Sequence, residues 1–447
     1  MRDRLSDAST QDVKALEEES ESIWDRATRV LTTGLWSVSH GAFRYPDGVF
    51  PLLARRGEGC ILWDTTGRPY VDWMIGWGPV ILGYRHPAVE QAIRDQLAEG
   101  PLLSLLHPLE VEVAERLCDA VPCAERVAFG KNGSDVLAAA VRVARAFTGR
   151  EIVLHHGYHG FHDWYLAAHP ACEGIPEALR PLIHEFGYND LEGLARLFDR
   201  FGDRIAAVVM EPTNIVLPAP GFLESVRQRT RENGSLLVFD EIITGFRWDL
   251  HGAQAVYGIT PDLSTFGKAM SNGFSASALV GKREFMEAGG IYHNRERVFL
   301  LSLTYGAETH SLAAALATMR IYESEPVVEH LHRQGGRLAE GIRQIAAHNH
   351  LEEHLGVDGR ACNLIYFTRD EEKKPSQPFR TLFLQEIIKR GIIAPSLVLS
   401  YSHSDADIDR TLDAIAAAAQ IYARALDEGV DQYLVGRPVK PVMRPYC

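Results

Sequence analysis

The chain has 447 residues, of which 46% are hydrophobic and 23% are charged, and its formal net charge at pH 7 is −13. These values are typical of a folded globular protein, and the acidic balance argues against a general binder of nucleic acids or anionic membranes. No run of about 18 apolar residues predicts a membrane span, and the N-terminus lacks the apolar core of a signal peptide. The six cysteines are scattered without a CxxC pair, so we expect reduced thiols and a cytoplasmic location.

Residues 1–55 are predicted to form an N-terminal segment in which an acidic amphipathic helix precedes a loop. Ile23, Trp24 and Ala27 recur at helical spacing, whereas glycines and prolines interrupt the pattern between residues 34 and 51. Residues 59–71 favour a β-hairpin, because two β-rich runs flank the turn sequence of residues 64–67.

Strand and helix patterns alternate from residue 126 to about residue 285. Predicted strands cover 126–129, 151–155, 205–210, 235–240, 263–266 and 277–280, and predicted helices cover 134–147 and 222–233. This alternation predicts an α/β fold with a mostly parallel central sheet and helices on both faces. Ligands bind beyond the carboxyl ends of such strands, so functional residues are expected there.

The alternation of strands and helices gives way to mostly helical patterns after residue 320. Helices are predicted at 327–347, 380–390 and 405–425, with a strand near 362–368. We therefore predict an N-terminal helix and loop segment at 1–55, a large α/β domain at 56–320 and a small C-terminal α+β domain at 321–447.

Lysine is scarce, with 8 lysines among the 46 basic residues, and Lys268 directly follows the predicted strand 263–266 and its glycine. Small residues come after it, so its amine can occupy a semi-buried pocket. Desolvation there lowers the pKa of an amine and makes it a nucleophile toward carbonyl groups. The alternative is a lysine that extends from a strand end into solvent.

Asp240 ends the hydrophobic strand LLVFD and therefore needs a partner, which can be a metal ion, a cation of the protein or a protonated heterocycle. Gly133 and Ser134 open a helix immediately after a strand. Free backbone N–H groups and the helix dipole make that position an anion site, although Ser134 as a simple N-cap is the alternative.

Four histidines lie between residues 155 and 162. Their spacing fits no standard zinc pattern and two glycines indicate a turn, so no metal site is predicted. Tyr158 lies between small residues and can present its ring as a stacking surface.

A lysine for a Schiff base, an aspartate for a pyridinium nitrogen, a phosphate cup and an aromatic surface are together what pyridoxal 5'-phosphate requires. The chain resembles the class III aminotransferases of fold-type I, especially the glutamate-1-semialdehyde aminomutase-like branch, from about residue 45 to its end. The resemblance rests on the stretches GCILWDTTGRPYVDW, NGSDVLAAAVRVARAFTGR, YHGFHDW, LLVFDEIITGFR and PDLSTFGKAMSNGF. It implies a central sheet of the seven-stranded type and a PLP-dependent transferase.

The resemblance also implies a role for each matching position. Lys268 matches the Schiff-base lysine, and Asp240 matches the carboxylate that keeps the ring nitrogen protonated. The remaining matches are cofactor contacts: Ile242 and Tyr158 on the two ring faces, Gly133 and Ser134 in the phosphate cup, Asn214 near the ring hydroxyl, and Thr304 reaching the phosphate of the neighbouring subunit. The last match implies a homodimer with sites at its interface.

Some positions depart from the family pattern. Gly41 falls near the place of the arginine that binds the substrate carboxylate in the aminomutase-like branch, and Arg44 lies three residues on. No arginine accompanies Ser402 near the C-terminus, whereas Glu308 and His310 are polar groups near the expected pocket. A glutamate donor would still need a cationic group, such as Arg247, for its carboxylates.

The leading hypothesis is an aminotransferase that moves an amino group from an amino acid, with glutamate the first choice, to an aldehyde or ketone such as a keto sugar or a biosynthetic tailoring intermediate. The alternative on the same scaffold is an intramolecular aminomutase that acts on glutamate-1-semialdehyde. A catalytically silent dimer of this fold is the alternative from another class. A dinucleotide oxidoreductase is disfavoured, because no GxGxxG follows a strand.

Overall fold

The computed structural model describes residues 10–32, 45–51, 53–170, 172–213, 215–292, 298 and 300–440. The chain forms two compact units. The large unit comprises Gly78–Ile81 and Pro87–Val328, and the small unit comprises the residues up to Trp77, Leu82–His86 and Glu329 onward. No helix in the described part of the chain combines the length and apolar character that a membrane crossing requires.

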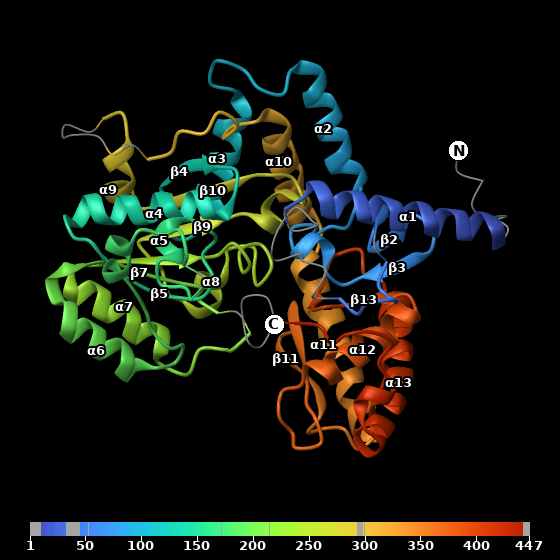
Figure 1. The fold of residues 1–447 in the computed structure, drawn as a ribbon. Helices are drawn as coiled ribbons and strands as arrows, with labels where there is room; N and C mark the ends of the chain where they lie inside the picture. Colours follow the sequence, from blue (N-terminus) through green and yellow to red (C-terminus); the bar gives the residue numbers. More distant parts are fainter. Residues whose placement is uncertain are drawn as a thin grey trace. The chain divides into compact units, whose positions relative to one another are not determined.

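The large unit is built on a seven-stranded sheet (Figure 1). Its strand order is β4 (Arg126–Gly130), β10 (Ser277–Gly281), β9 (Leu263–Phe266), β8 (Leu236–Asp240), β7 (Ile205–Met210), β5 (Ile152–His156) and β6 (Ile183–Glu185). β10 runs opposite to the other six strands of this sheet, which are parallel to one another. The predicted mostly parallel α/β sheet of the seven-stranded type is therefore confirmed.

Side-chain alternation along the central strands supplies the cores on the two faces of this sheet. On β7, Ala207 and Val209 belong to one hydrophobic cluster, whereas Val208 and Met210 belong to the other. Every residue of β7 and β8 is buried, which explains why these strands appear in the sequence as continuous apolar runs.

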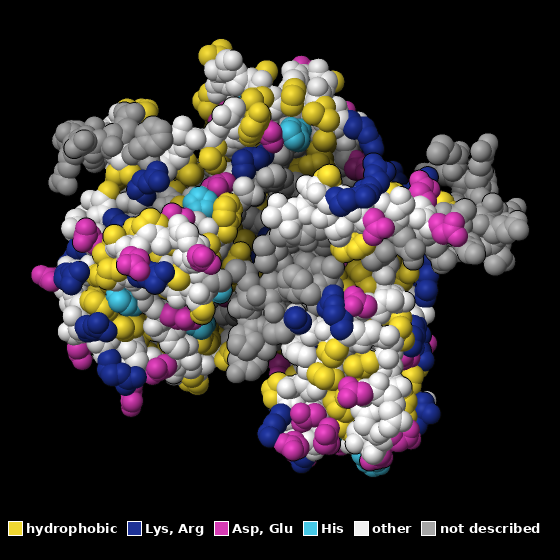
Figure 2. All heavy atoms as spheres, in the orientation of Figure 1, with side chains coloured by type: hydrophobic (Ala, Val, Ile, Leu, Met, Phe, Trp, Pro, Cys, Tyr) yellow, Lys and Arg dark blue, Asp and Glu magenta, His cyan; other side chains and the backbone are white. Residues whose placement is uncertain are grey.

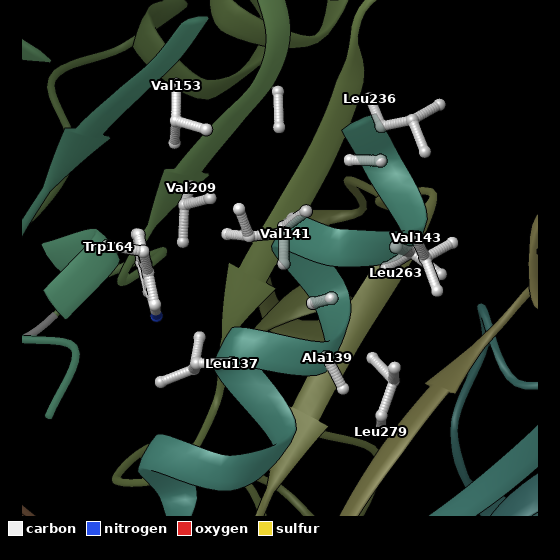
Figure 3. Packing of buried hydrophobic residues seen from close by; sticks show 14 of the residues in the cluster. Leu137, Ala139, Val141, Val143, Val153, Trp164, Val209, Leu236, Leu263 and Leu279 are labelled. Atoms are coloured by element: carbon white, nitrogen blue, oxygen red, sulfur yellow. The ribbon is translucent and has the colours of Figure 1, made fainter. Parts of the chain in front are cut away.

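Helices cover both faces. On the first face, residues of α4 (Gly133–Thr148) pack with Val153 of β5, Val209 of β7, Leu263 of β9 and Leu279 of β10, and with Trp164 of α5 (Asp163–Leu166) (Figure 3). Phe285 and Met286 of α9 (Arg283–Met286) belong to the same cluster. On the second face lie α6 (Leu191–Phe201) and α7 (Phe222–Asn233). The remaining helices of the large unit are α2 (Pro87–Glu99), α3 (Pro108–Ala120), α8 (Ala253–Tyr257) and α10 (Thr309–Ser324).

The small unit contains two further sheets and four long helices. One sheet has the order β1 (Ala54–Glu58), β2 (Ile61–Asp64), β3 (Pro69–Asp72) and β13 (Ile392–Ile393), and the other has β11 (Leu355–Arg360), β12 (Asn363–Thr368) and β14 (Leu397–Val398). The helices are α1 (Thr10–Val30), α11 (Val327–His348), α12 (Gln377–Lys389) and α13 (Asp405–Glu428).

The hairpin of β2 and β3 belongs with the C-terminal segment, which differs from the predicted division at residue 55. The reason is a long-range parallel pairing of β3 with β13, in which Val71 lies opposite Ile392 and Asp72 opposite Ile393. That pairing joins strands more than 300 residues apart, and no local pattern in the sequence indicates it.

Candidate functional site

Several of the predicted site residues lie at or just after the ends of four strands of the large unit. β8 ends at Asp240, β9 is followed by Gly267 and Lys268, β4 leads into Gly133, and β5 leads into the turn with Tyr158. These strands run in the same direction, so their carboxyl ends lie at one edge of the sheet. That edge is where open α/β sheets bind their ligands.

Asp240 is held by His159. The carboxylate is 4% exposed and the imidazole 0% exposed, and Oδ2 of Asp240 lies 2.8 Å from Nδ1 of His159. Nε2 of His159 donates to the carbonyl of His156 over 3.0 Å, and the backbone N–H of Ile242 donates to Oδ1 of Asp240 over 3.1 Å. Each ring nitrogen of His159 therefore contacts one oxygen acceptor, the carboxylate of Asp240 on one side and the carbonyl of His156 on the other.

Ile242 lies against Gly133 at the start of α4. A Cβ atom on Gly133 would lie 3.1 Å from two atoms of the Ile242 side chain, and one on Gly267 would lie 3.1 Å from its Cδ1. The start of α4 and the residue before Lys268 therefore both lie against Ile242, the half-buried isoleucine two residues after Asp240. Glycine at 133 keeps the backbone N–H groups at the start of α4 open to a close approach.

Ser134 contacts the turn that carries Tyr158. Its Oγ accepts a long hydrogen bond of 3.4 Å from the backbone N–H of Phe161, and a Cβ on Gly160 would come within 2.0 Å of this oxygen. Gly160 also has a φ of +96°, so only glycine is suited to this position. The half-buried Tyr158 packs edge-on against Tyr165, with ring centroids 5.7 Å apart.

Lys268 begins a short 3-10 turn, Lys268–Ser271, directly after Gly267. Its φ of +41° lies in the left-handed region that non-glycine residues rarely adopt, and its side chain is half-buried. Ala269 and Met270 behind it are fully buried and fix the turn in the core. Unusual backbone conformations of this kind concentrate at functional sites, because the surrounding packing must hold them.

The histidine tract is distributed among different contacts. Nδ1 of His156 donates to the carbonyl of Phe186 over 3.0 Å, and Nε2 of His162 lies 3.6 Å from a carboxylate oxygen of Asp135. Among the residues that the structure describes, no His, Cys, Asp and Glu side chains are grouped so that they could hold a metal ion.

Glu241 is a buried residue that the sequence analysis did not single out. It is 0% exposed and accepts hydrogen bonds from Thr244 Oγ1 (2.7 Å), Ala253 N (2.6 Å), and both N (3.1 Å) and Nε2 (3.0 Å) of Gln254. Burial raises the pKa of Glu241, and these hydrogen bonds oppose the rise. Glu241 therefore organises the loop between Asp240 and α8.

The structure also describes Thr304 and Arg247 among the predicted positions. Thr304 is an exposed residue of the turn 304–307 before α10. Asn214, Gly41 and Arg44 lie outside the described residues. Arg247 is 1% exposed and donates to the carbonyl of Gly78 over 2.7 Å, so it supports the backbone of the large unit.

A comparison with known protein families and structures adds to this geometry. The family model for aminotransferase class-III matches residues 43–419. The chain is similar to a 3-aminobutyryl-CoA aminotransferase of Cloacimonas acidaminovorans, with 31% identity over 89% of this chain and 95% of the relative. It is also similar to a glutamate-1-semialdehyde 2,1-aminomutase of Desulforudis audaxviator, with 36% identity over 82% of this chain and 90% of the relative.

Among solved structures, the chain is similar to the PLP internal aldimine form of the Sphingopyxis sp. MTA144 FumI protein, with a TM-score of 0.84 and 29% identity over 94% of this chain and 98% of that chain. An omega-transaminase from Sphaerobacter thermophilus gives a TM-score of 0.80 and 27% identity over 91% of this chain and 98% of that chain.

Proposed function

The chain belongs to the class III aminotransferase family, whose enzymes are PLP-dependent and of fold-type I, and we propose that it transfers an amino group from an amino acid to an aldehyde or ketone. Glutamate is the first choice of donor. The observation that carries this proposal is the position of Lys268 at the same sheet edge as the buried Asp240–His159 pair and the open helix start at Gly133.

The residues at this edge fit PLP. A Cβ on Gly133 would lie only 3.1 Å from Ile242, so glycine avoids a tight contact here, which suits a phosphate bound to backbone N–H groups with an apolar side chain beside it. Asp240 offers a carboxylate that His159 keeps in place, and that carboxylate suits a protonated ring nitrogen. We propose that Gly133 and Ser134 hold the phosphate and that Ile242 and Tyr158 hold the ring. The contact of Asn214 with the ring hydroxyl also remains a prediction.

PLP supplies an aldehyde that takes up the amino group and a ring that accepts electron density from the substrate carbon. In our proposal Nζ of Lys268 would hold the cofactor covalently, and once the substrate amine had displaced it, the released Lys268 amine would move a proton between the substrate carbon and the cofactor. Asp240 holds the proton on the ring nitrogen, and its pairing with His159 fixes the direction of the carboxylate.

The acceptor is proposed to be neutral near its reacting carbon, as in a keto sugar. The sequence has Gly41 in place of the usual carboxylate-binding arginine, and the stretch LSYSHSD around Ser402 contains no arginine. Intramolecular transfer on glutamate-1-semialdehyde remains the second candidate, because relatives with that name are 36% identical to the chain. A silent dimer is disfavoured, because Lys268 and Asp240 are both present.

We further propose a homodimer in which Thr304 reaches the cofactor phosphate of the neighbouring subunit. Two observations support it. Thr304 is exposed. The loop between α2 and α3 exposes four leucines, visible as hydrophobic atoms at the top of Figure 2: Leu102 (42%), Leu103 (47%), Leu105 (83%) and Leu106 (74%). A cytoplasmic location also stays a prediction.

A substrate screen tests the function. Glutamate should convert the cofactor from its aldehyde to its amino form, as seen in the visible absorbance, and an aldehyde or ketone acceptor should reverse the change. Turnover of glutamate-1-semialdehyde should be slow. Efficient turnover of that compound without an added donor, lost in Arg44→Ala, would establish the aminomutase instead.

A further inference from the structure

Lys131 and Glu308 form a half-buried ion pair beside the phosphate cup. Nζ of Lys131 lies 2.6 Å from Oε2 of Glu308, and the two side chains are 14% and 22% exposed. Nζ also donates to Oγ of Ser311 over 3.3 Å, and Nε2 of His310 lies 3.6 Å from the same Glu308 oxygen. This is one of the least exposed lysine ion pairs in the described part of the chain.

The lysine end of the pair lies in the loop next to the cup formed by Gly133 and Ser134. Lys131 lies between β4 and α4, two residues before Gly133. The backbone of this loop is already fixed on its other side, because Ser275 Oγ donates to the carbonyl of Lys131 over 3.0 Å and Ser277 Oγ donates to that of Asn132 over 2.9 Å. The Lys131 side chain is therefore available to hold another element against the cup.

The glutamate end belongs to the turn with Thr304. Glu308 is the N-cap position of α10, and its backbone N–H donates to the carbonyl of Tyr305 over 3.2 Å, which closes the turn. The next residue, Thr309, donates through N and Oγ1 to the carbonyls of Pro101 and Gly100 at the start of the exposed leucine loop. Glu308 thus lies where the turn, α10 and that loop meet.

We propose that the Lys131–Glu308 pair is a positioning device that sets the phosphate cup and the Thr304 turn relative to each other. This inference rests on the proposed function, in which the cup holds one cofactor phosphate and Thr304 reaches the phosphate of the other subunit. One ion pair then adjusts phosphate contacts at both sites of the dimer. Neither side chain needs to touch the reacting atoms.

The test compares Lys131→Met and Glu308→Gln with the wild type in the full-length protein. Each variant should weaken PLP binding about tenfold, the size expected when a hydrogen bond to a charged group is lost. The double variant should be no weaker than either single variant, because both remove the same contact. At saturating PLP, kcat and the absorbance maximum should stay unchanged. The charge reversal Lys131→Glu with Glu308→Lys should restore part of the affinity.

Lys373→Met is the matched control, since Lys373 forms an exposed ion pair with Glu353. It should leave PLP binding unchanged. Inorganic phosphate supplies a second readout, because its protection of the apoprotein against heat should fall in Lys131→Met but not in Lys373→Met. A purely structural pair would lower the melting temperature of the apoprotein and leave the affinities for PLP and phosphate intact at 25 °C.

Mixed dimers test the link between subunits. One subunit carries Lys268→Ala and Glu308→Gln, and the other is wild type, so covalently bound cofactor reports only the wild-type subunit. That cofactor should be lost faster than in a dimer whose first subunit carries Lys268→Ala alone. Equal rates of cofactor loss from the two mixed dimers would overturn the proposed link between the subunits. Wild-type affinity in both single variants would overturn the positioning role, whereas a wild type that binds no PLP would overturn the proposed function instead.

Discussion

His155 and His159 come from one tract and are both buried, at 3% and 0% exposure, with ring centroids 6.0 Å apart. Their surroundings differ. Both nitrogens of His159 have polar partners, and one of these is the carboxylate of Asp240. Neither ring nitrogen of His155 has a hydrogen-bond partner among the residues that the structure describes. Burial, reinforced by the neighbouring histidines, lowers the pKa of His155 to about 3 and keeps this ring neutral.

The difference shows that burial alone does not identify a functional histidine. Nδ1 of His159 contacts the carboxylate of Asp240, whose negative charge the proposed chemistry uses. Asp240 is the last residue of β8 and also accepts a hydrogen bond from the backbone N–H of Ile242. His155 lies in the same layer and packs edge-on against Tyr165, with centroids 5.4 Å apart. We therefore assign His159 a positioning role in catalysis and His155 a role in packing. The following substitutions test this assignment.

Lys268→Ala should have the largest effect on turnover, and the variant should lose activity without losing its fold. The wild type should be yellow, with a visible band that borohydride removes, and the variant should lack the covalent bond to the cofactor. We expect turnover to fall by roughly four decades, the upper range for the loss of a positioned acid–base group. Circular dichroism should show a folded protein.

Lys282→Ala is the control for this substitution, since Lys282 also follows a strand but lies 3.8 Å from Asp262. It should keep the band. A reducible bond that persists in Lys268→Ala would show that another lysine carries the cofactor.

Asp240→Asn removes the carboxylate that His159 contacts. The pyridinium loses its counter-charge, so we expect proton abstraction to slow by roughly two or more decades while cofactor still binds through its phosphate. Single-turnover absorbance changes measure this step. Near-normal turnover in Asp240→Asn would exclude this role of Asp240.

Glu241→Gln tests the neighbouring buried carboxylate. This substitution should lower the melting temperature and leave the rate of the folded enzyme unchanged.

The sequence predicts the central sheet well because its strands are buried on both faces. The run IAAVVM and the run LLVFD are continuous apolar segments, and the structure places them at Ile205–Met210 and Leu236–Asp240. Lys268 and Asp240 could be singled out for the same reason, since a charged residue at the end of such a strand needs an explanation.

Long-range partners could not be predicted. His159 meets Asp240 across 81 residues, and the four histidines of the tract look alike in the sequence. The need of Asp240 for a partner was evident, but its identity depends on where the turn after β5 folds. Glu241 was missed because its donors are mostly backbone N–H groups and neutral side chains, which carry no distinctive pattern.

His159→Phe should have a smaller effect than the loss of Asp240 itself. The carboxylate keeps the hydrogen bond from Ile242 N but loses its contact with the His159 ring. A hydrogen bond to a charged group contributes about 1.5–3 kcal/mol, so we expect kcat to fall by at least tenfold. His159→Gln should recover part of the rate, because an amide N–H can still donate. Equal rates in the wild type and in His159→Phe would contradict the positioning role.

His155→Leu should have the smallest effect, and that effect should appear in stability at acidic pH. The folded-state pKa of His155 is about 3, well below its ordinary value of 6.5, so the unfolded chain binds a proton that the folded chain excludes. The contribution of the neutral ring is fully present above pH 6.5 and is lost as the pH falls toward 3. Between pH 7.5 and pH 5 the wild type should lose about 2 kcal/mol of unfolding free energy through this residue. His155→Leu should remove that slope, as measured by urea unfolding at both pH values, while kcat stays within about twofold. A large loss of kcat in His155→Leu would mean that both histidines support catalysis, and the contrast with His159 would fail.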